Sequence, residues 1–335
     1  MIKSLSIKDF GPIRDLNIKK LGSINIFIGA NGTGKSFVLK SLYAAIKSIE
    51  QNNRGKEIKT ISELISEKLY WTFQPNNLGD LVRKNAEDSL KFSISNESGR
   101  QLSFSFGKST TKSVKNVENN FPQTEVNSIF LPTKEILSSR TFMINLKDNY
   151  KEFGFDDTYY DLAKALTPVT KGRNYAEFSK SREKMKKAIN GKIFYDENSR
   201  EWKFKDNNNF EYPIGTTSEG VKKISIIETL LGNRYLSKGS LIFIDEPESN
   251  LHPKLLFEFM EIIFELSKIG VQFFIATHSY FVVKKLYILA QKNKKAIPII
   301  SFENDNIVIS DLKNGIPDNP IIDESINLYK EEVRL

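Results

Sequence analysis

The sequence predicts an α/β fold with a mixed central sheet, an N-terminal antiparallel β subdomain and a helical lobe. Three observations favour this fold. Short apolar runs rich in β-branched residues alternate along the chain with segments whose apolar residues recur at helical spacing. A glycine-rich loop, Gly29–Ser36, joins one such run to a helical segment. Two further runs, Leu241–Glu246 and Val271–His278, end in ionisable residues, as strands of α/β sheets do at ligand sites.

Residues 1–134 are expected to form the N-terminal half of the molecule. Polar and apolar residues alternate at its start and in a later hairpin segment, which is the pattern of half-buried strands. The elements expected in order are strands within residues 1–28, helices at 35–49 and 57–70, a hairpin at 89–106, an exposed loop at 107–124 and a strand at 128–131. The segment 71–77, which begins at Trp71, is expected to break the second helix. Phe10 is expected in the core, with a place beside a bound base as the alternative for Phe10 or Arg14.

Residues 135–192 are expected to form the helical lobe and residues 193–335 the C-terminal half, so that the chain is a single domain. Lysine and arginine gather at 171–192, where a solvated helix face is the simpler explanation and a nucleic-acid surface the alternative. The C-terminal elements expected in order are a hairpin at 193–204, a helix from 216, a strand at 241–246, a helix at 254–268, a strand at 271–277, a helix at 282–291, a hairpin at 297–309 and a helix from 323.

Composition limits the classes of protein that fit. The chain has 335 residues and no cysteine, so it can bury a substantial core but has no disulfide and no thiolate metal ligand. This composition fits a reducing cytoplasm, where we expect the protein to be located. The start of the chain lacks an apolar signal core, and no run is long enough to span a bilayer, so no membrane partner is expected. The net charge of +8 fits a nucleic-acid partner and, equally, a lysine-rich genome composition.

Residues 29–36 have the form G-x-x-x-x-G-K-S of a phosphate-binding loop. Gly29, Gly32 and Gly34 admit backbone angles that bulkier residues resist, so successive N–H groups can turn inward toward an anion. The helix beginning near Lys35 adds its positive N-terminal end. Lys35 would then reach the β- and γ-phosphates of a nucleotide, and the Ser36 hydroxyl would hold Mg²⁺.

Two carboxylates and a histidine follow apolar strands further along the chain. Asp245 at the end of its strand would complete a Mg²⁺ site with Ser36. Glu246 could orient and deprotonate an attacking water. The chain has two histidines, His252 and His278. His278 lies at the end of a strand, where α/β sheets bind ligands, and is a candidate sensor of the γ-phosphate.

A second anion site is predicted at the start of the helix that follows residue 216. Ser218 and Gly220 would lie at its N-terminus, where backbone N–H groups can face an anion. The simpler explanation is an ordinary helix cap formed by Ser218 or Thr217.

These motifs occur in the order phosphate loop, S-x-G helix start, strand ending in Asp-Glu and strand ending in His. This order resembles the ABC-type ATPase head, a P-loop NTPase, and within that class the SMC, RecF and OLD-like group. The opening IKSLSIKDFGPIRDLNIKKLGSINIFIGANGTGKS and the block LIFIDEPESNLHP are similar to that group, and the resemblance covers nearly the whole chain. The form DEPE-x-N-L-H-P is typical of OLD-like ATPases and related phage-defence ATPases, including the Septu type.

The resemblance implies ATP and Mg²⁺ as ligands and a head-to-tail homodimer or higher assembly. ATP would lie between two copies, with Asn250 and His252 in the segment that links the two sites. The residues assigned on this basis are Gly29, Ala30, Asn31, Gly32, Thr33, Gly34, Lys35, Ser36, Phe37, Asp245, Glu246 and His278 of one copy, and Ser218 and Gly220 of the other.

The sequence departs from the ABC pattern in two places. Its signature is Thr-Ser-Glu-Gly-Val, where transporters have Leu-Ser-Gly-Gly-Gln. The glutamine that usually follows a strand has no clear match: the expected loop is Pro132–Glu135, and Gln74 is the alternative. The helical lobe is too short for a long coiled-coil arm.

The first functional hypothesis is an ATPase whose ATP-driven dimerisation gates a partner effector, such as a nuclease, in phage defence or DNA processing. The residues after His278 are too few for the Toprim nuclease domain of OLD proteins, so we expect a separately encoded effector. One alternative is a RecF-like repair ATPase that binds DNA through the basic segments 171–192 and 284–295. A further alternative is a scaffold that stays locked with ATP bound and hydrolyses it very slowly. A transporter ATPase would require a membrane partner and normally a glutamine loop.

Overall fold

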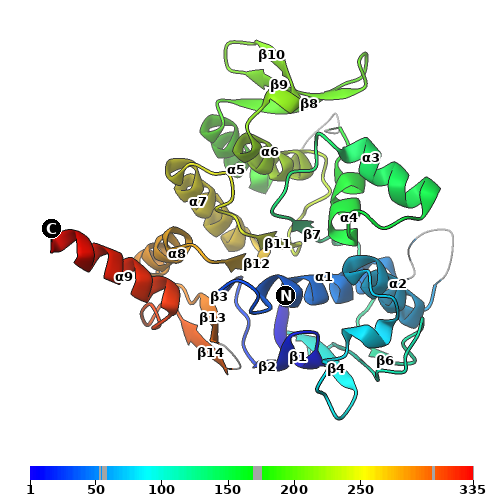
Figure 1. Cartoon of the computed structure of the whole chain (residues 1–335). Helices are drawn as coiled ribbons and strands as arrows, with labels where there is room; N and C mark the ends of the chain where they lie inside the picture. Colours follow the sequence, from blue (N-terminus) through cyan, green and yellow to red (C-terminus); the bar gives the residue numbers. More distant parts are fainter. Residues whose placement is uncertain (53, 55–58, 169–175, 304–305, 335) are drawn as a thin grey trace. The chain divides into compact units, whose positions relative to one another are not determined.

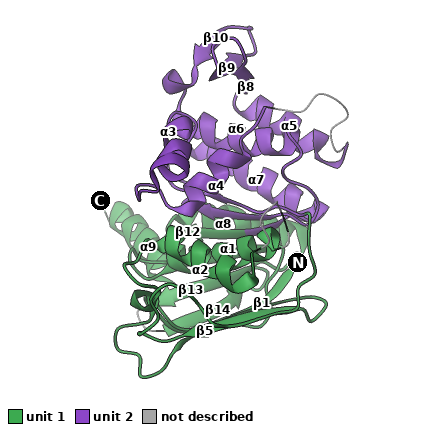
Figure 2. Cartoon of the chain, turned by 90° about the vertical axis from the view of Figure 1, so that its right-hand side faces the viewer, with its two compact units in different colours: residues 1–125, 274–335 green, residues 126–273 purple. Residues whose placement is uncertain are grey.

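The computed structural model describes residues 1–52, 54, 59–168, 176–303 and 306–334. The chain forms two compact units. Unit 1 joins the two ends of the chain, Met1–Glu125 and Phe274–Leu335, and unit 2 is the continuous stretch Val126–Phe273 (Figure 2). The chain therefore leaves unit 1 once and returns to it within a single strand, β12 (Gln272–Thr277).

A mixed sheet in unit 1 positions the glycine-rich loop. Its strand β3 (Ile24–Gly29) runs directly into the loop and is buried along its whole length, as expected for a strand covered on both faces. The neighbours of β3 are β12 and β13 (Pro298–Glu303). Strand β13 pairs in parallel with β3 and antiparallel with β14 (Asn306–Asp311). The mixed sheet predicted from the sequence is thus confirmed.

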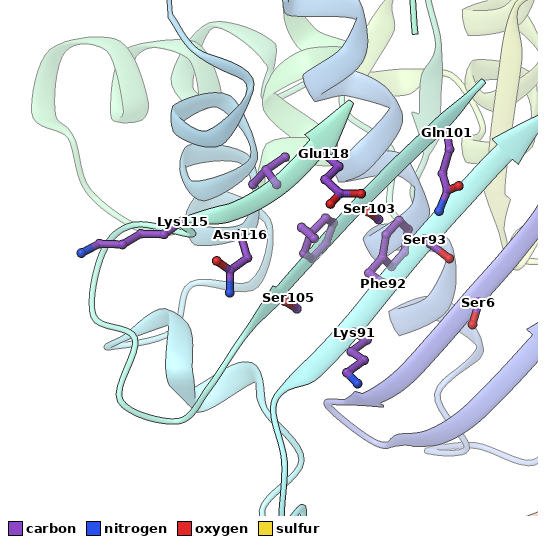
Figure 3. A pocket seen from close by; sticks show the side chains of 12 residues that line it. Ser6, Lys91, Phe92, Ser93, Gln101, Ser103, Ser105, Lys115, Asn116 and Glu118 are labelled. Atoms are coloured by element: carbon purple, nitrogen blue, oxygen red, sulfur yellow. The ribbon is translucent and has the colours of Figure 1, made fainter. Parts of the chain in front are cut away.

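The second sheet of unit 1 is antiparallel. Its strands follow the order β2 (Ile13–Ile18), β1 (Ile2–Phe10), β4 (Leu90–Asn96), β5 (Gln101–Phe106), β6 (Asn116–Asn119). One face is apolar and buries Phe10, whose ring centroid lies 5.0 Å from that of Phe37. The prediction that Phe10 belongs to the core is confirmed. On the polar face, residues including Lys91, Ser93 and Ser103 line a cavity of about 630 Å³ (Figure 3).

The segment 107–124 is more ordered than the sequence predicted. It contains β6, and Val114 is fully buried, with its N–H donating to the Ser66 hydroxyl at 2.9 Å. The prediction of an exposed loop holds for most of this segment, but it missed β6 and the burial of Val114, because β6 is short and polar. A four-residue edge strand has too few apolar residues to show the alternation by which strands are recognised.

The helix α2 (Ile61–Phe73) continues through Trp71, where a break was predicted. Its start is fixed by a capping box between Thr60 and Glu63, and it ends at Gln74, which has a left-handed φ of 51°. The expected residues 57 and 58 of this helix lie outside the described residues. The other helical segments of unit 1 are α1 (Lys35–Gln51), a 3-10 turn (Leu78–Leu81), α8 (Tyr280–Asn293) and α9 (Pro320–Val333).

Unit 2 contains the strand that ends in the two carboxylates. This strand, β11 (Leu241–Asp245), pairs in parallel with β7 (Ile129–Leu131), and the rings of Phe130 and Phe243 stack across the pair at 6.2 Å. The helical segments of unit 2 are α3 (Arg140–Asn145), a π-helical turn (Leu146–Tyr150), α4 (Asp157–Ala165), α5 (Ala176–Ala188), a 3-10 turn (Ile214–Thr216), α6 (Glu219–Gly232) and α7 (Pro253–Ile269).

A small antiparallel sheet of unit 2 precedes α6 along the chain. Its order is β10 (Glu211–Pro213), β9 (Glu201–Asp206), β8 (Gly191–Asp196), and it is drawn at the top of Figure 1. The hairpin predicted from the sequence forms β8 and β9, and β10 adds a third strand. Within the described ranges, no helix has both the length and the apolar character needed to cross a membrane.

Candidate nucleotide-binding site

The glycine-rich loop adopts a backbone that requires its glycines. Gly29, Gly32 and Gly34 have φ angles of 149°, 78° and 99°, in the region that side chains disfavour. A Cβ at Gly29 would lie 2.7 Å from the carbonyl oxygen of Phe302, so the space there is closed as well. A Cβ at Gly32 would have no atom within 4 Å. The loop is therefore tightly packed at its base, Gly29, and open at its crest, Gly32.

Lys35 lies across the base of this loop. Its Nζ donates to the carbonyl oxygens of Gly29 and Ala30 at 2.8 and 2.7 Å, and the residue is 7% exposed. Thr33 Oγ1 also donates to Ala30, at 2.9 Å. Helix α1 begins at Lys35 without a side-chain cap bond. Because its first N–H groups lack that cap, the helix start suits an anion.

The side chain of Phe37 packs in an aromatic cluster. Its ring lies 4.6 Å from that of Phe73, and a Cβ on Gly11 would come within 2.3 Å of it. The side chain is thus held in the aromatic cluster beneath the loop. Ser36 and Phe37 remain in the first turn of α1, where backbone N–H groups face the helix start.

His278 also belongs to unit 1. It is exposed and directly follows β12, the strand next to β3. The N–H of Ser279 donates to Thr277 Oγ1 at 3.0 Å, which fixes the turn between β12 and α8. The loop and His278 therefore follow two neighbouring strands of one sheet.

Asp245 and Glu246 lie in unit 2, at the end of β11. Asp245 is 9% exposed, whereas Glu246 is half-buried with a positive φ of 48°. Glu246 Oε2 accepts a hydrogen bond from the Ser249 hydroxyl at 3.1 Å. The turn ends at His252, which caps α7 by accepting from the N–H of Lys254. We call residues 246–252 the acidic turn.

The start of α6 packs against the acidic turn. A Cβ at Gly220 would lie 2.7 Å from the carbonyl oxygen of Asn250 and 2.7 Å from Leu251 Cδ2. Ser218 occupies the N-cap position, but its hydroxyl has no hydrogen-bond partner among the described residues. The ordinary cap that the sequence suggested is therefore absent, and the hydroxyl is exposed.

Comparison with known proteins agrees with this arrangement. Residues 24–284 match the family described as AAA domain, putative AbiEii toxin, Type IV TA system. The chain belongs to this family. It is therefore an NTPase of the AAA type, with a P-loop nucleotide-binding fold.

Two solved SMC heads share the fold of this AAA-domain chain. An SMC head bound to the C-winged helix domain of ScpA is 12% identical, with a TM-score of 0.54 over 92% of this chain and 97% of that one. An SMC head from Pyrococcus furiosus, bound to the C-terminal domain of ScpA, is 11% identical, with a TM-score of 0.51 over 100% and 99%. A curated relative, the uncharacterized protein MJECL10 of Methanocaldococcus jannaschii, is 31% identical over 97 residues. That match covers 28% of this chain and less than half, 42%, of the relative.

The predicted site residues fall into two groups. The phosphate loop and His278 lie in unit 1, and Asp245, Glu246, Ser218 and Gly220 lie in unit 2. The described residues contain no cluster of three or more acidic or histidine side chains that could hold a metal by itself. A Mg²⁺ site shared by Ser36, Asp245 and a nucleotide remains a prediction.

Lys223 is a functional candidate that the sequence analysis missed. This residue of α6 is 6% exposed, and its Nζ donates to the carbonyl oxygens of Glu246 and Ser249 at 3.0 and 3.3 Å. It thereby holds the backbone of the acidic turn, in which Glu246 has a positive φ. One weak signal was available, because Lys222 and Lys223 are basic residues near the N-terminal end of a helix, which favours acidic ones.

Lys222 connects α6 to the loop where the glutamine was expected. Its Nζ lies 3.2 Å from Glu135 Oε1, 3.2 Å from Ser138 Oγ and 2.9 Å from Glu219 Oε1. Burial alone would lower the pKa of Lys222, but the hydrogen bonds to Glu219 and Glu135 outweigh it and raise the pKa. The other glutamine candidate, Gln74, lies in unit 1, where its buried Nε2 has no hydrogen-bond partner among the described residues.

Tyr159 of α4 is a second neighbour of the acidic strand end. Burial, together with the carboxylates of Asp156 and Asp245, raises the pKa of Tyr159 to about 12, although a hydrogen bond with the backbone of Lys134 opposes the shift. The phenol therefore stays protonated at neutral pH and is available as a donor near Asp245.

Replacing Gly220 with alanine is expected to displace the acidic turn, because the new methyl group would meet a backbone carbonyl that cannot rotate away. We expect a loss of about 1–3 kcal/mol in the free energy of unfolding, measured by urea denaturation, and a lower ATPase rate. Gly215→Ala is the matched control, since a Cβ there has no atom within 4 Å. Equal stability of the two variants would contradict the close packing of α6 on the turn.

The stability of the protein is expected to depend on pH through Lys223. Burial lowers the pKa of Lys223 from 10.5 to about 8, although Glu248, Glu246, Asp245 and Glu219 oppose the shift. Between these two values the unfolded chain binds the proton and the folded chain releases it, so stability rises with pH. Below pH 8 the folded state carries the full cost of the buried charge, about 3 kcal/mol.

The measurement is the free energy of unfolding of the wild type minus that of Lys223→Met, followed from pH 7 to 10.5. This difference should be flat below about pH 8 and increase above it. A difference that is constant over the whole range would show that Lys223 titrates normally.

Proposed function

We propose that this AAA-domain ATPase binds ATP with Mg²⁺, hydrolyses it, and pairs head-to-tail with a second copy when ATP is bound. The pairing gates a separate effector protein, such as a nuclease, in phage defence or DNA processing. The observation that carries the proposal is the coupling within unit 2. The start of α6, with its exposed Ser218 hydroxyl, is joined through Gly220 and Lys223 to the turn that carries Glu246.

The residues present fit the proposed ligands. The open crest at Gly32 leaves room for phosphate oxygens, and the start of α1 supplies N–H donors. Lys35 would exchange its two carbonyl partners for the β- and γ-phosphates. Ser36 and Asp245 would hold Mg²⁺, which neutralises phosphate charge when it is bound.

Glu246 would accept the proton of the attacking water while His278 contacts the γ-phosphate. Ser218 and Gly220 of the second copy would bind the same nucleotide from the other side. Contact at Ser218 would be transmitted to Glu246, because Lys223 and Gly220 hold the two segments together. Hydrolysis would therefore depend on pairing.

Two observations support a protein effector over direct DNA binding. Both SMC heads reported above were solved with a domain of ScpA bound, so this fold presents surfaces for partner proteins. In the basic segment 171–192, Arg182 is buried against Glu228 at 2.7 Å, and Lys186 lies 3.4 Å from the same carboxylate. These two cations stabilise the packing of α5 on α6. Arg173 of the same segment lies outside the described residues.

Native mass spectrometry of the protein purified at native expression level with ATP and Mg²⁺ tests the proposal. We expect a dimer or higher assembly that retains a second protein, and we expect Ser218→Arg to reduce it to a monomer. A partner-free dimer that retains DNA would favour the RecF-like repair ATPase. A monomer that binds ATP without any partner would contradict ATP-driven pairing.

A further inference from the structure

We propose that a second cavity, in unit 2, binds a small nucleotide-like anion, that is, a phosphate group attached to a flat ring. The cavity has a volume of about 300 Å³ and is formed by the start of α3, the β8–β9 hairpin and the 3-10 turn before α6. The residues that carry the argument are Arg140, Tyr195, Arg200, Glu201, Trp202 and Ile214, all of which line it. All of them belong to unit 2, separate from the phosphate loop of unit 1.

Two arginines supply the positive charge of this cavity. Arg140 is held in place by its Nε, which donates to the carbonyl oxygen of Ala163 at 2.8 Å. Its two terminal nitrogens have no hydrogen-bond partner among the described residues, and neither Arg140 nor Arg200 forms an ion pair with a described carboxylate. The guanidinium of Arg140 is half-buried, and this partial burial lowers its pKa. A charge that is partly removed from water favours an ionic partner, and a phosphate would pair with it in a bidentate manner.

Aromatic rings form another wall of the cavity. Tyr195 and Trp202 are directly opposite each other on β8 and β9, and their ring centroids lie 5.6 Å apart at an interplanar angle of 66°. Trp202 is 6% exposed, and its indole N–H has no acceptor among the described residues. Ile214, which is also buried, adds apolar surface. Rings of this kind stack with nucleobases whatever the base.

Size and charge favour a small ligand over a nucleic-acid strand. A volume of about 300 Å³ is at the lower end of the range for small-molecule sites. Two lysines of the same sheet are already paired, Lys203 with Asp196 at 2.5 Å and Lys205 with Glu211 at 3.2 Å. Of the described basic residues of this sheet and its hairpin turn, Lys192 and Arg200 form no ion pair, and two such charges are fewer than a polyphosphate backbone needs. Glu201 could accept a hydrogen bond from a ribose hydroxyl or a base amino group.

The cavity lies close along the chain to the residues of the proposed ATP-dependent pairing. Ile214 and Gly215 line it and precede Ser218 by four and three residues. A ligand in the cavity would contact the segment that positions Ser218. If the proposed function holds, such a ligand would change the ATPase rate of the wild type.

Fluorescence of Trp202 tests the binding site directly. The chain has two tryptophans, so Trp71→Phe leaves Trp202 as the sole indole. Adding Lys35→Ala weakens nucleotide binding at the phosphate loop by about 100-fold or more. In this double variant we expect adenosine or uridine monophosphate to change the emission with saturation. Inorganic phosphate and adenosine should each bind roughly tenfold more weakly, because each lacks half of the recognised groups.

Arg140→Met and, separately, Arg200→Met in the same background should weaken nucleotide binding about tenfold or more. Lys192→Met is the matched control, since it removes a positive charge from the same hairpin outside the cavity. Absence of any saturable signal with the monophosphates would overturn the proposal, as would phosphate binding as tightly as the nucleotides. Failure of the proposed function would show separately. In that case ATP would still bind the Lys35→Ala variant, and its binding would not change the emission of Trp202.

Discussion

Glu246→Gln is expected to slow ATP hydrolysis by about 100-fold or more and to trap an ATP-bound dimer, because general-base catalysis contributes about that factor. Glutamine has the shape of glutamate, and its carbonyl oxygen can still accept from the Ser249 hydroxyl that now bonds Glu246 Oε2 at 3.1 Å. The acidic turn should therefore keep its conformation while the proton acceptor is lost. Single-turnover hydrolysis measures the rate, and size-exclusion chromatography with ATP measures the dimer.

Glu248→Gln is the matched control for this variant, because it removes the same charge two residues further along the same turn. We expect it to hydrolyse ATP at a rate within a few-fold of the wild type. If Glu246→Gln hydrolyses ATP like the parent, Glu246 is not the base. If both variants lose activity equally, the effect comes from the charge of the turn and not from proton transfer.

Lys35→Ala is expected to weaken ATP binding by about 100-fold or more. Removing one partner of a buried charge pair costs about 2–5 kcal/mol, and 1.4 kcal/mol corresponds to a factor of ten. The ammonium group of Lys35 is already buried at the base of the loop, 2.8 Å from Gly29 O and 2.7 Å from Ala30 O. Isothermal titration calorimetry with ATP and Mg²⁺ measures the affinity.

A loss of affinity could also follow from damage to the loop, since the substitution leaves the carbonyls of Gly29 and Ala30 without their donor. Lys35→Met, which restores the length of the side chain without the charge, separates the two causes and should bind ATP as weakly as alanine does. Lys40→Ala, on the same helix, should bind ATP normally. Normal affinity in Lys35→Met would contradict the role of the ammonium group.

The elements that could be predicted from the sequence are those whose signal is local. The run Ile24–Ile28, the glycines after it and the helix from Lys35 specify a strand, a turn and a helix within a few residues of one another. The capping box at Thr60 similarly fixes the start of α2. The end of α2 at Phe73 lies within the segment 71–77 that was predicted to break it, and Gln74 follows in a left-handed conformation.

The parts that escaped prediction depend on contacts between distant segments. Val114 is buried, and its N–H donates to the hydroxyl of Ser66, 48 residues away. No pattern within residues 107–124 contains that information. Lys223 similarly becomes important through the carbonyl of Glu246, 23 residues along the chain. The sequence identified the candidate phosphate loop and acidic residues by type and spacing. It could not show which ordinary lysine supports them.

The divided course of unit 1 has a consequence for how the protein is made. Its mixed sheet combines β3, from the first 29 residues, with β12 and β13, which follow residue 271. During synthesis β3 cannot pair with both neighbours until β12 and β13 have been made. By that point the continuous unit 2 is complete. The apolar residues of β3 are exposed throughout that interval, roughly 12 to 50 seconds at about 5–20 residues per second, and are then a target for chaperones. Slow synthesis or a stall before residue 272 should therefore aggregate the nascent chain through β3.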